Sequence, residues 1–523
     1  MGRGGLWLTA IISVILPIIA FVIAEINFGP VLTIFGPDGA RARPNVVLIM
    51  ADDVGLGDIG VQYRERTGQQ PMAPTPNIDA LAREGLWFTD AHSPTALCSP
   101  SRYAVMSGNY NYRSYAPWGV WGSFRESPFK KGDATLGTVA RDAGYATGFI
   151  GKWHLGGDFY KKDSGEIYRG EDRGEAELGM DARRWIGGGP RDLGFEYDFT
   201  LPTGVQGPFY VAYENGEWFP LEEDSRLIHL NARTAKDPAF VAGKGPGTGD
   251  SAWDGTRINV LLARKASEFI RKRAGEPPFF LCYWSPAVHI PHTPPRVLDG
   301  EPVAGTTPTR HLDMNRVLDW EVKQIVEALK QTGAYDDTLI IFTSDNGGLS
   351  DPEAGKAGHL SNGGWRAYKN SPYEGGHRVP LITVWPGRIA PGTRADALVN
   401  GTDLLATLAA VVGADLKEDQ GMDSWSFLSL LHGAGGFKGR SELLLQSGSD
   451  KELMYRRGPW KLIIQSDHKL TKFEPSALFN LAENPQEKET GNLLEHPDHQ
   501  KRAAEMLSRY LEIRNGGGRT VPR

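Results

Sequence analysis

Cysteine is scarce in this sequence of 523 residues, which contains only Cys98 and Cys282. So low a count excludes a disulfide framework, although one bridge between the two thiols stays open. Cys282 lies in the apolar run 279–284, where a cysteine usually packs as a small buried side chain. The fold must therefore depend on hydrophobic cores, and the length favours two to four domains.

An excess of basic residues is also lacking, since 57 Lys and Arg stand against 63 Asp and Glu, for a net charge of −6. This balance argues against a broad nucleic-acid surface, and no nucleic-acid partner is expected. It does not exclude an anionic substrate, because a few lysines and arginines set the field within a cleft. With 40% hydrophobic and 23% charged residues, the composition is that of a folded globular enzyme.

One long uncharged apolar run is present, over residues 6–24. As a helix it would span about 28 Å, close to the hydrocarbon thickness of a bilayer. We therefore predict a membrane anchor within an N-terminal segment of residues 1–43, with a cleaved secretory signal peptide as the alternative. In both cases the chain is exported, either anchored to the membrane by residues 6–24 or secreted or periplasmic after cleavage.

Strand and helix patterns alternate from residue 44 to residue 414. Residues 45–50 form a short apolar run typical of a buried strand, and residues 338–342 form another. Apolar residues at three- and four-residue spacing over 314–329 predict a helix with one buried face. The alternation predicts an α/β catalytic domain with a large, mainly parallel sheet flanked by helices.

Two further segments differ from this pattern. Residues 156–249 are rich in Gly, Asp, Glu and Arg, show little periodicity, and are expected to form an excursion over the sheet edge that shapes a substrate pocket. Residues 415–523 are expected to form a smaller C-terminal α+β subdomain. Its predicted elements are antiparallel strands at 443–446, 460–465 and 477–481 and a helix at 497–514.

Carboxylate and amide side chains directly follow two of the predicted strands, Asp52 and Asp53 after the first, Asp345 and Asn346 after the second. Ligands of an open parallel sheet bind beyond the carboxyl ends of its strands, so the two pairs should converge. Three carboxylates and an amide oxygen suit Ca²⁺ better than zinc, because no His or Cys is among them. The alternative is that these residues only form turns.

Cys98 opens the sequence Cys-Ser-Pro-Ser-Arg, in which Pro100 suits the first position of a helix. Cys98 would then lie at the positive end of that helix, where an anion is favoured and a thiol is acidified. Arg102, one turn further on, can reach back toward the same point. A purely structural cysteine in front of a helix is the alternative.

The pattern Cys98-x-Pro100-x-Arg102 resembles the signature of the cysteine-type sulfatases, a family of the alkaline-phosphatase-like superfamily. The resemblance implies a sulfuric ester hydrolase of that fold. It also implies that a formylglycine-generating enzyme oxidises Cys98 to formylglycine, whose hydrate is the nucleophile. Further motifs follow in the family's order: Asn45 to Asp53, Gly151-Lys152-Trp153-His154, His289-Ile290-Pro291, Ser344-Asp345-Asn346-Gly347, and Lys369 before Glu374-Gly375-Gly376.

The same resemblance implies the ligands of the metal and the contacts of the sulfate group. Ca²⁺ would be held by the residues of the two strand ends, Asp52, Asp53, Asp345 and Asn346. Formylglycine at position 98 would contact the same ion. Arg102 and Lys152 would hold the formylglycine, while Lys152 and Lys369 would neutralise sulfate oxygens.

Proton transfers are also implied by the resemblance. Asp345 would take a proton from the attacking hydroxyl, and His289, with Lys369, would protonate the departing alcohol. His154 would take the proton whose removal expels sulfate. His289 is preferred to His292 because the family's histidine precedes x-Pro. The family's further polar contact to sulfate cannot be placed within residues 201–206.

The natural substrate stays open between aryl sulfates and sulfated carbohydrates, because specificity would come from residues 156–249 and the C-terminal subdomain. A phosphonate or phosphate ester hydrolase with the same nucleophile is one alternative, although a dianion calls for more cations than Arg102, Lys152 and Lys369. An inactive, membrane-anchored binding protein is another. That interpretation requires the nucleophile or a metal ligand to be missing from the family's motifs, and all of them are present in this sequence.

Overall fold

The computed structural model describes residues 43–171, 179–236, 244–275, 277–433, 437, 439–448 and 452–522. The predicted anchor at residues 6–24 lies outside this part of the chain. Within the described part, no helix combines the length and the apolar character that a membrane crossing requires.

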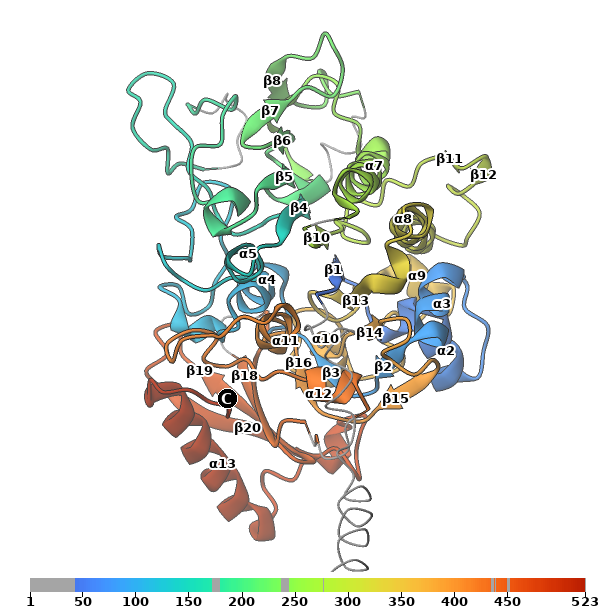
Figure 1. Cartoon of the computed structure of the whole chain (residues 1–523). Helices are drawn as coiled ribbons and strands as arrows, with labels where there is room; N and C mark the ends of the chain where they lie inside the picture. The colour runs from blue at the N-terminus through green and yellow to red at the C-terminus, as the bar shows by residue number, and fades with distance from the viewer. Residues whose placement is uncertain are drawn as a thin grey trace, which may run out of the picture.

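A ten-stranded sheet forms the centre of the structure (Figure 1). Its five middle strands run parallel, in the order β13, β1, β10, β4 and β5, and shorter strands complete both edges. The strands in spatial order are β15 (Thr393–Ala395), β2 (Leu86–Phe88), β14 (Leu381–Val384), β13 (Thr338–Ser344), β1 (Asn45–Ala51), β10 (Phe279–Trp284), β4 (Ala146–Lys152), β5 (Tyr197–Leu201), β6 (Ala212–Glu214) and β7 (Glu217–Phe219).

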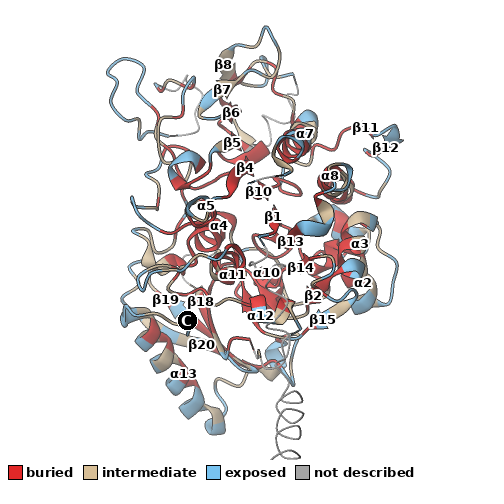
Figure 2. Cartoon of the chain, in the orientation of Figure 1, coloured by how far each residue is buried: buried red, intermediate tan, exposed pale blue. Residues whose placement is uncertain are grey.

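Strand β1 distributes its apolar side chains between two hydrophobic cores, one on each face of the sheet. Val46, Leu48 and Met50 belong to one core, and Val47 and Ile49 belong to the other, as the two-residue period of a strand requires. Figures 1 and 2 show the two helical layers, with the buried sheet between them. The first face is covered by α4 (Cys98–Ser107), α5 (Leu136–Asp142) and α11 (Asp403–Val412), and the second by α3 (Pro76–Glu84), α7 (Gly255–Arg273) and α8 (Arg310–Gln331).

The C-terminal region is a separate layer built on its own four-stranded antiparallel sheet. The strands are β17 (Glu442–Gln446), β18 (Glu452–Arg457), β19 (Trp460–Ser466) and β20 (Phe473–Asn480), and α13 (Pro497–Asn515) packs against them. Strand β18 is absent from the sequence prediction. The predicted fold class, a mainly parallel sheet with helices on both faces and a smaller antiparallel α+β region, is confirmed.

The segment 156–249 is more regular than its sequence suggests. It supplies β5, which extends the parallel sheet, and then β6 and β7, which form the antiparallel edge. A hairpin of β8 (Leu227–Leu230) and β9 (Gly247–Asp250) follows. The alternating apolar residues Tyr197, Phe199 and Leu201 already carry a strand pattern, which the charged composition of the segment conceals.

Short elements connect these layers. They include η2 (Leu56–Asp58), α2 (Gly60–Thr67), β3 (Ala91–His92), η5 (Gly204–Gln206), β11 (Val297–Leu298), β12 (Glu301–Pro302), α9 (Pro352–Lys356), α10 (Glu374–His377), β16 (Val399–Asn400) and α12 (Leu428–Leu431).

Candidate active site

The two predicted metal-ligand pairs meet at one edge of the sheet, because β1 and β13 lie side by side, parallel and in register. The backbone N–H of Asp53 donates to Asp345 Oδ1 at 3.2 Å, and Asn346 Nδ2 donates to Asp53 Oδ1 at 2.9 Å. These three residues and Asp52 are fully buried. Three carboxylates therefore share one small, dry space.

The oxygens of this group fit a hard cation. Asp52 Oδ1, Asp53 Oδ2 and Asn346 Oδ1 are buried, and none has a hydrogen-bond partner among the described residues. An unpaired buried oxygen is costly, and a cation would supply the missing interaction. Burial and the charge of Asp52 raise the pKa of Asp345 well above its usual range, so a divalent cation would help to keep all three carboxylates ionised. Donor sets made only of oxygen suit Ca²⁺.

Helix α4 places Cys98 beside this group. The helix begins at Cys98, two residues before the predicted start, and all ten of its residues are buried. Pro100 is tolerated there because amides of the first turn have no acceptor within a helix. Cys98 Sγ lies 3.4 Å from His154 Nδ1. The thiol is thus held at a helix N-terminus with an imidazole next to it.

Cationic side chains from three separate elements face the carboxylates. The ion pairs join Lys152 Nζ to Asp52 Oδ2 at 2.6 Å, Lys369 Nζ to Asp53 Oδ1 at 2.6 Å, and an Arg102 guanidinium nitrogen to Asp345 Oδ2 at 2.7 Å. Arg102 also donates to the carbonyl oxygen of Lys152 at 3.0 Å. Burial lowers the pKa of Lys369, but Asp53 and Cys98 outweigh it, and the pKa is raised above its usual value. Lys369 therefore stays charged.

The two predicted histidines lie at the same site and are neutral in this arrangement. His289 Nδ1 lies 2.6 Å from the carbonyl oxygen of Ile290, which can only accept, so Nδ1 carries the proton. Nε2 of His289 then faces Asp53 Oδ2 at 3.8 Å. Burial, followed by the charges of Lys152 and Lys369, lowers the pKa of His289 to about 3. Burial and Lys152 also lower the pKa of His154 well below its usual value.

Two residues of the site have a left-handed backbone. Asp53 has φ 64° and His154 has φ 59°, in a region that non-glycine residues enter at a cost of about 1–3 kcal/mol. The neighbouring backbone fixes both, since the N–H of Leu349 donates to the carbonyl oxygen of Asp53 at 3.1 Å and the N–H of His154 donates to that of Pro202 at 2.8 Å. Both side chains are thereby aimed into the site.

A threonine that the sequence prediction left out also lies close to the site. Gly204, with φ +86°, packs so tightly that an added Cβ would lie 2.9 Å from Lys152 Cδ. The hydroxyl of the preceding residue, Thr203, is buried and has no hydrogen-bond partner among the described residues. No local pattern marks Thr203 in the sequence. Its position follows from the bonds between residues 201–202 and 153–154.

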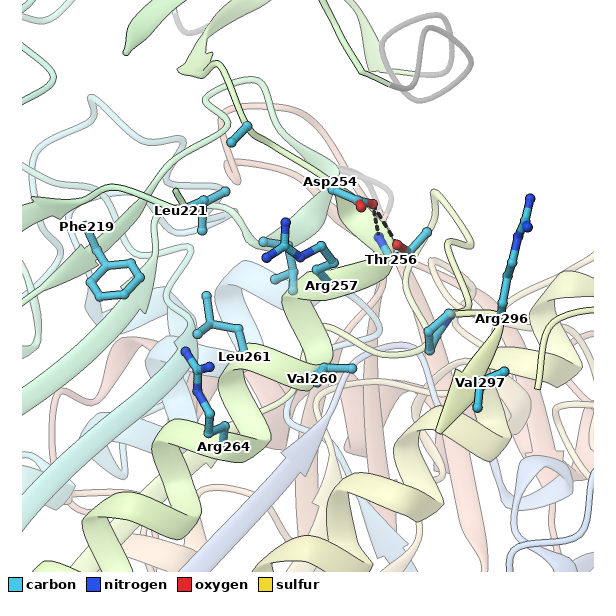
Figure 3. Close-up of a pocket in the computed structure, with 13 residues that line it drawn as sticks. Phe219, Leu221, Asp254, Thr256, Arg257, Val260, Leu261, Arg264, Arg296 and Val297 are labelled. Atoms are coloured by element: carbon cyan, nitrogen blue, oxygen red, sulfur yellow. Dashed lines mark hydrogen bonds between the residues drawn. The ribbon is translucent and has the colours of Figure 1, made fainter. Parts of the chain in front are cut away.

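A pocket of about 640 Å³ lies elsewhere, between β7, α7 and the segment 295–297 (Figure 3). Arg257, Arg264 and Arg296 line it together with apolar side chains, and Arg257 pairs with Glu222 at 2.8 Å. None of the predicted catalytic or metal-binding residues lines this pocket. It is therefore not the place where the reaction would occur.

The chain as a whole is similar to known sulfatases. The sulfatase family profile matches residues 44–414. An N-acetylgalactosamine-6-O-sulfatase of Bacteroides thetaiotaomicron is 30% identical over 89% of this chain and 92% of its own length. The steryl-sulfatase of Rattus norvegicus is 31% identical over 75% of this chain and 70% of its own length.

Solved structures agree with these matches. A Bacteroides thetaiotaomicron protein solved in work on glycosaminoglycan metabolism has a TM-score of 0.75 and 27% identity, over 91% of this chain and all of that chain. A Pseudoalteromonas sulfatase, at 22% identity and a TM-score of 0.64, covers 92% of both chains and shows the shared fold. The chain belongs to the sulfatase family. It is an enzyme of the class that hydrolyses sulfate esters.

Proposed function

We propose that this sulfatase cleaves a sulfate monoester to an alcohol and inorganic sulfate, with a formylglycine derived from Cys98 as nucleophile and Ca²⁺ as cofactor. The observation that carries the proposal is the convergence of Cys98, three buried carboxylates and three buried cations. Oxygens of Asp52, Asp53 and Asn346 there have no hydrogen-bond partner among the described residues. Asp52, Asp53, Asp345 and Asn346 would hold the ion. When present, Ca²⁺ would polarise a sulfate oxygen and the formylglycine hydrate would supply the oxygen nucleophile.

The chain's own cations would hold the substrate anion. Arg102 and Lys152, from α4 and the end of β4, would orient the side chain at position 98. Lys152 and Lys369 would neutralise sulfate oxygens in a dry site, where such interactions are strong. The buried hydroxyl of Thr203 is a candidate for a further hydrogen bond to sulfate, since Thr203 directly precedes Gly204, which packs against Lys152.

Four residues would move protons. Asp345 would accept one from the attacking hydroxyl, and His154, 3.4 Å from Cys98 Sγ, would take the one whose removal releases sulfate. His289 and Lys369 would protonate the leaving alcohol. Lys369 is already protonated, whereas Nε2 of His289 carries no proton. The negative charge of a bound sulfate would favour protonation of His289 at Nε2.

A sulfated carbohydrate is the substrate class that we propose. The support is the similarity to N-acetylgalactosamine-6-sulfatases from a bacterium and from mammals, one of them matched over 92% of its length. Aryl sulfates would serve as assay substrates. Residues 156–249 and the C-terminal region 415–523, beside a catalytic domain at 44–414, would then set which sugar is accepted.

Maturation and location complete the proposal. A formylglycine-generating enzyme would be a partner during synthesis, because Cys98 needs its modification before it can act. The chain would be exported, with residues 6–24 within the segment 1–43 as membrane anchor or as a cleaved signal. Either route fits an enzyme that acts on sulfated carbohydrate outside the cytoplasm.

The test is to express the full chain with a formylglycine-generating enzyme and to assay an aryl sulfate, a sulfated amino-sugar disaccharide and an aryl phosphonate ester. Each assay is run with and without a calcium chelator. Cys98→Ala is compared with Cys282→Ala, which alters the other buried cysteine, a member of the hydrophobic core on β10. Peptide mass spectrometry reports the modification at position 98.

The expected result is sulfate release that depends on calcium, is abolished by Cys98→Ala and survives Cys282→Ala. A preference for the phosphonate ester would support the nucleophile derived from Cys98 and contradict a sulfate ester as the substrate. If formylglycine is present at position 98 and none of the three esters reacts, the proposed substrate class is too narrow, and the binding-protein alternative is then tested.

A further inference from the structure

A second cluster of titratable side chains is formed by Asp58, His311 and His359, of which Asp58 lies five residues after the candidate calcium ligand Asp53. Asp58 ends η2, His311 lies in the first turn of α8, and His359 follows α9. All three are at most 3% exposed. Nε2 of His311 lies 3.1 Å and Nε2 of His359 lies 2.8 Å from Asp58 Oδ1, so that two imidazoles from distant segments converge on one carboxylate oxygen.

Within the described part of the chain, no Lys or Arg forms an ion pair with this carboxylate. Among the described residues, the ion-pair partners of Asp58 are His311 and His359 only, and the partner of nearby Asp351 is His292, at 3.8 Å. The rings of His292 and His311 are 5.2 Å apart, which joins the two groups. The cluster thus holds two carboxylates and three imidazoles without a Lys or Arg. A buried carboxylate needs a cation, which is either an imidazolium or a metal ion.

The donor set favours a metal ion of a particular class. One ligand atom from each of Asp58, His311 and His359 lies within 4.8 Å of the others. Two imidazole nitrogens and one carboxylate oxygen are ligands typical of Zn²⁺ and neighbouring transition metals, unlike the oxygen-only set at Asp52 and Asp345.

A fourth ligand is available from Asn315, one helical turn after His311. Its Nδ2 lies 3.1 Å from Asp58 Oδ1, while its Oδ1 is buried without a hydrogen-bond partner in the described part of the chain. The two ends of an amide exchange places by a half-turn about the last side-chain bond. That rotation would turn an unsatisfied oxygen toward the point where Asp58, His311 and His359 converge.

We propose that this cluster is a structural site for one divalent transition-metal ion of the zinc class, bound by Asp58, His311 and His359 and completed by Asn315 Oδ1. The site goes beyond the sulfatase reaction and shares no ligand with the calcium site. It would join three segments at the border of the active site. Two of them already touch, since the N–H of Gly57 donates to the carbonyl oxygen of Ser361 at 2.8 Å.

The experiment uses the full-length protein, stripped with a chelator and reloaded with Ca²⁺. It is then titrated with Co²⁺, which reports a mixed nitrogen–oxygen site through its visible absorption, and with Zn²⁺ followed by metal analysis after gel filtration. His359→Ala removes one proposed ligand. His468→Ala is the matched control, because it removes an exposed histidine from the C-terminal region.

We expect wild type and His468→Ala to retain about one equivalent of Zn²⁺ besides calcium, with Co²⁺ absorption that Zn²⁺ displaces. His359→Ala should bind either metal at least about tenfold more weakly, with its calcium content unchanged. Wild-type protein that retains no stoichiometric Zn²⁺ and shows no Co²⁺ absorption would overturn the proposal, as would unchanged binding in His359→Ala. If His359→Ala does not fold, the wild-type titration decides alone.

Discussion

Replacing Lys461 by methionine tests whether the C-terminal region supports the active site. Lys461 Nζ, on β19, is fully buried and lies 3.0 Å from Glu374 Oε1 and 2.8 Å from Glu487 Oε1. Glu374 opens α10, and the carbonyl oxygen of Gly376 in that helix accepts from the N–H of Gly347 at 2.9 Å. Gly347 directly follows the predicted ligand Asn346, so one chain of contacts joins β19 to the predicted calcium site.

The magnitude follows from the charges that the substitution leaves behind. Removing one partner of a buried ion pair typically costs about 3–5 kcal/mol, because the remaining charge is buried without compensation. Lys461 compensates two carboxylates, although Arg378 still contacts Glu374 at 2.6 Å. We therefore expect Lys461→Met to lower the free energy of unfolding by about 3–5 kcal/mol and to weaken calcium binding, while the methionine still fills most of the space.

Urea unfolding measures the stability and a calcium titration measures the coupling to the site. Glu487→Gln, alone and combined with Lys461→Met, completes a double-mutant cycle. If unpaired charge is the cause, the double variant should lose less than the sum of the single losses. A loss below about 1 kcal/mol for Lys461→Met, or additive losses with unchanged calcium affinity, would refute the reasoning.

Three further predictions concern other parts of the structure. Gly204→Ala should lower kcat/KM at least about tenfold, because the added methyl group would displace Lys152. Gly387→Ala is the control, since Gly387 has a similar positive φ but no atom close to the added methyl group, and its kcat/KM should not fall. Equal losses for both variants in steady-state assays would contradict this prediction. Calcium removal should lower Tm in scanning fluorimetry, because the carboxylates at the site lose their cation, and an unchanged Tm would count against the metal site. Burial raises the pKa of Glu321 to about 7, so the folded state keeps a proton that the unfolded state releases near pH 4.5. Stability should therefore fall by up to about 3 kcal/mol as pH rises from about 4.5 to about 7, and Glu321→Gln should flatten the Tm–pH curve over this range.

Part of the active site can be predicted from the sequence, because the strands that carry its predicted metal ligands are recognisable from local patterns. The strands predicted at 45–50 and 338–342 are short apolar runs. In the structure they span Asn45–Ala51 and Thr338–Ser344. Parallel pairing of those strands then places Asp52, Asp53, Asp345 and Asn346 at one edge. The remaining site residues come from motif resemblance, and their chemical roles stay predictions that the proposed assays test.

Elements whose stability comes from partners are harder to predict. Strand β18 carries a charged C-terminal half, Tyr455-Arg456-Arg457, and is recognisable only through its pairing with β17 and β19. Arg456 is nevertheless buried, because it reaches Asp90 in the catalytic region at 2.7 Å. An arginine that the sequence pattern predicts to be solvent-exposed is therefore part of the interface between the C-terminal and catalytic regions.

The buried charge clusters show the limit of sequence reasoning most clearly. Asp58 meets His311 and His359 across 253 and 301 residues, and Lys461 meets Glu374 across 87. Each side chain alone is an ordinary polar residue, and no periodicity links it to its partners. What brings them together is the packing of helices, strands and loops that are distant in the sequence, where burial converts isolated polar residues into groups that must be neutralised. The same physical demand, charge in a dry space, accounts for the carboxylates of the predicted calcium site, for the proposed zinc-class site and for the buried ion pairs of Lys461 and Arg456 with Glu374 and Asp90.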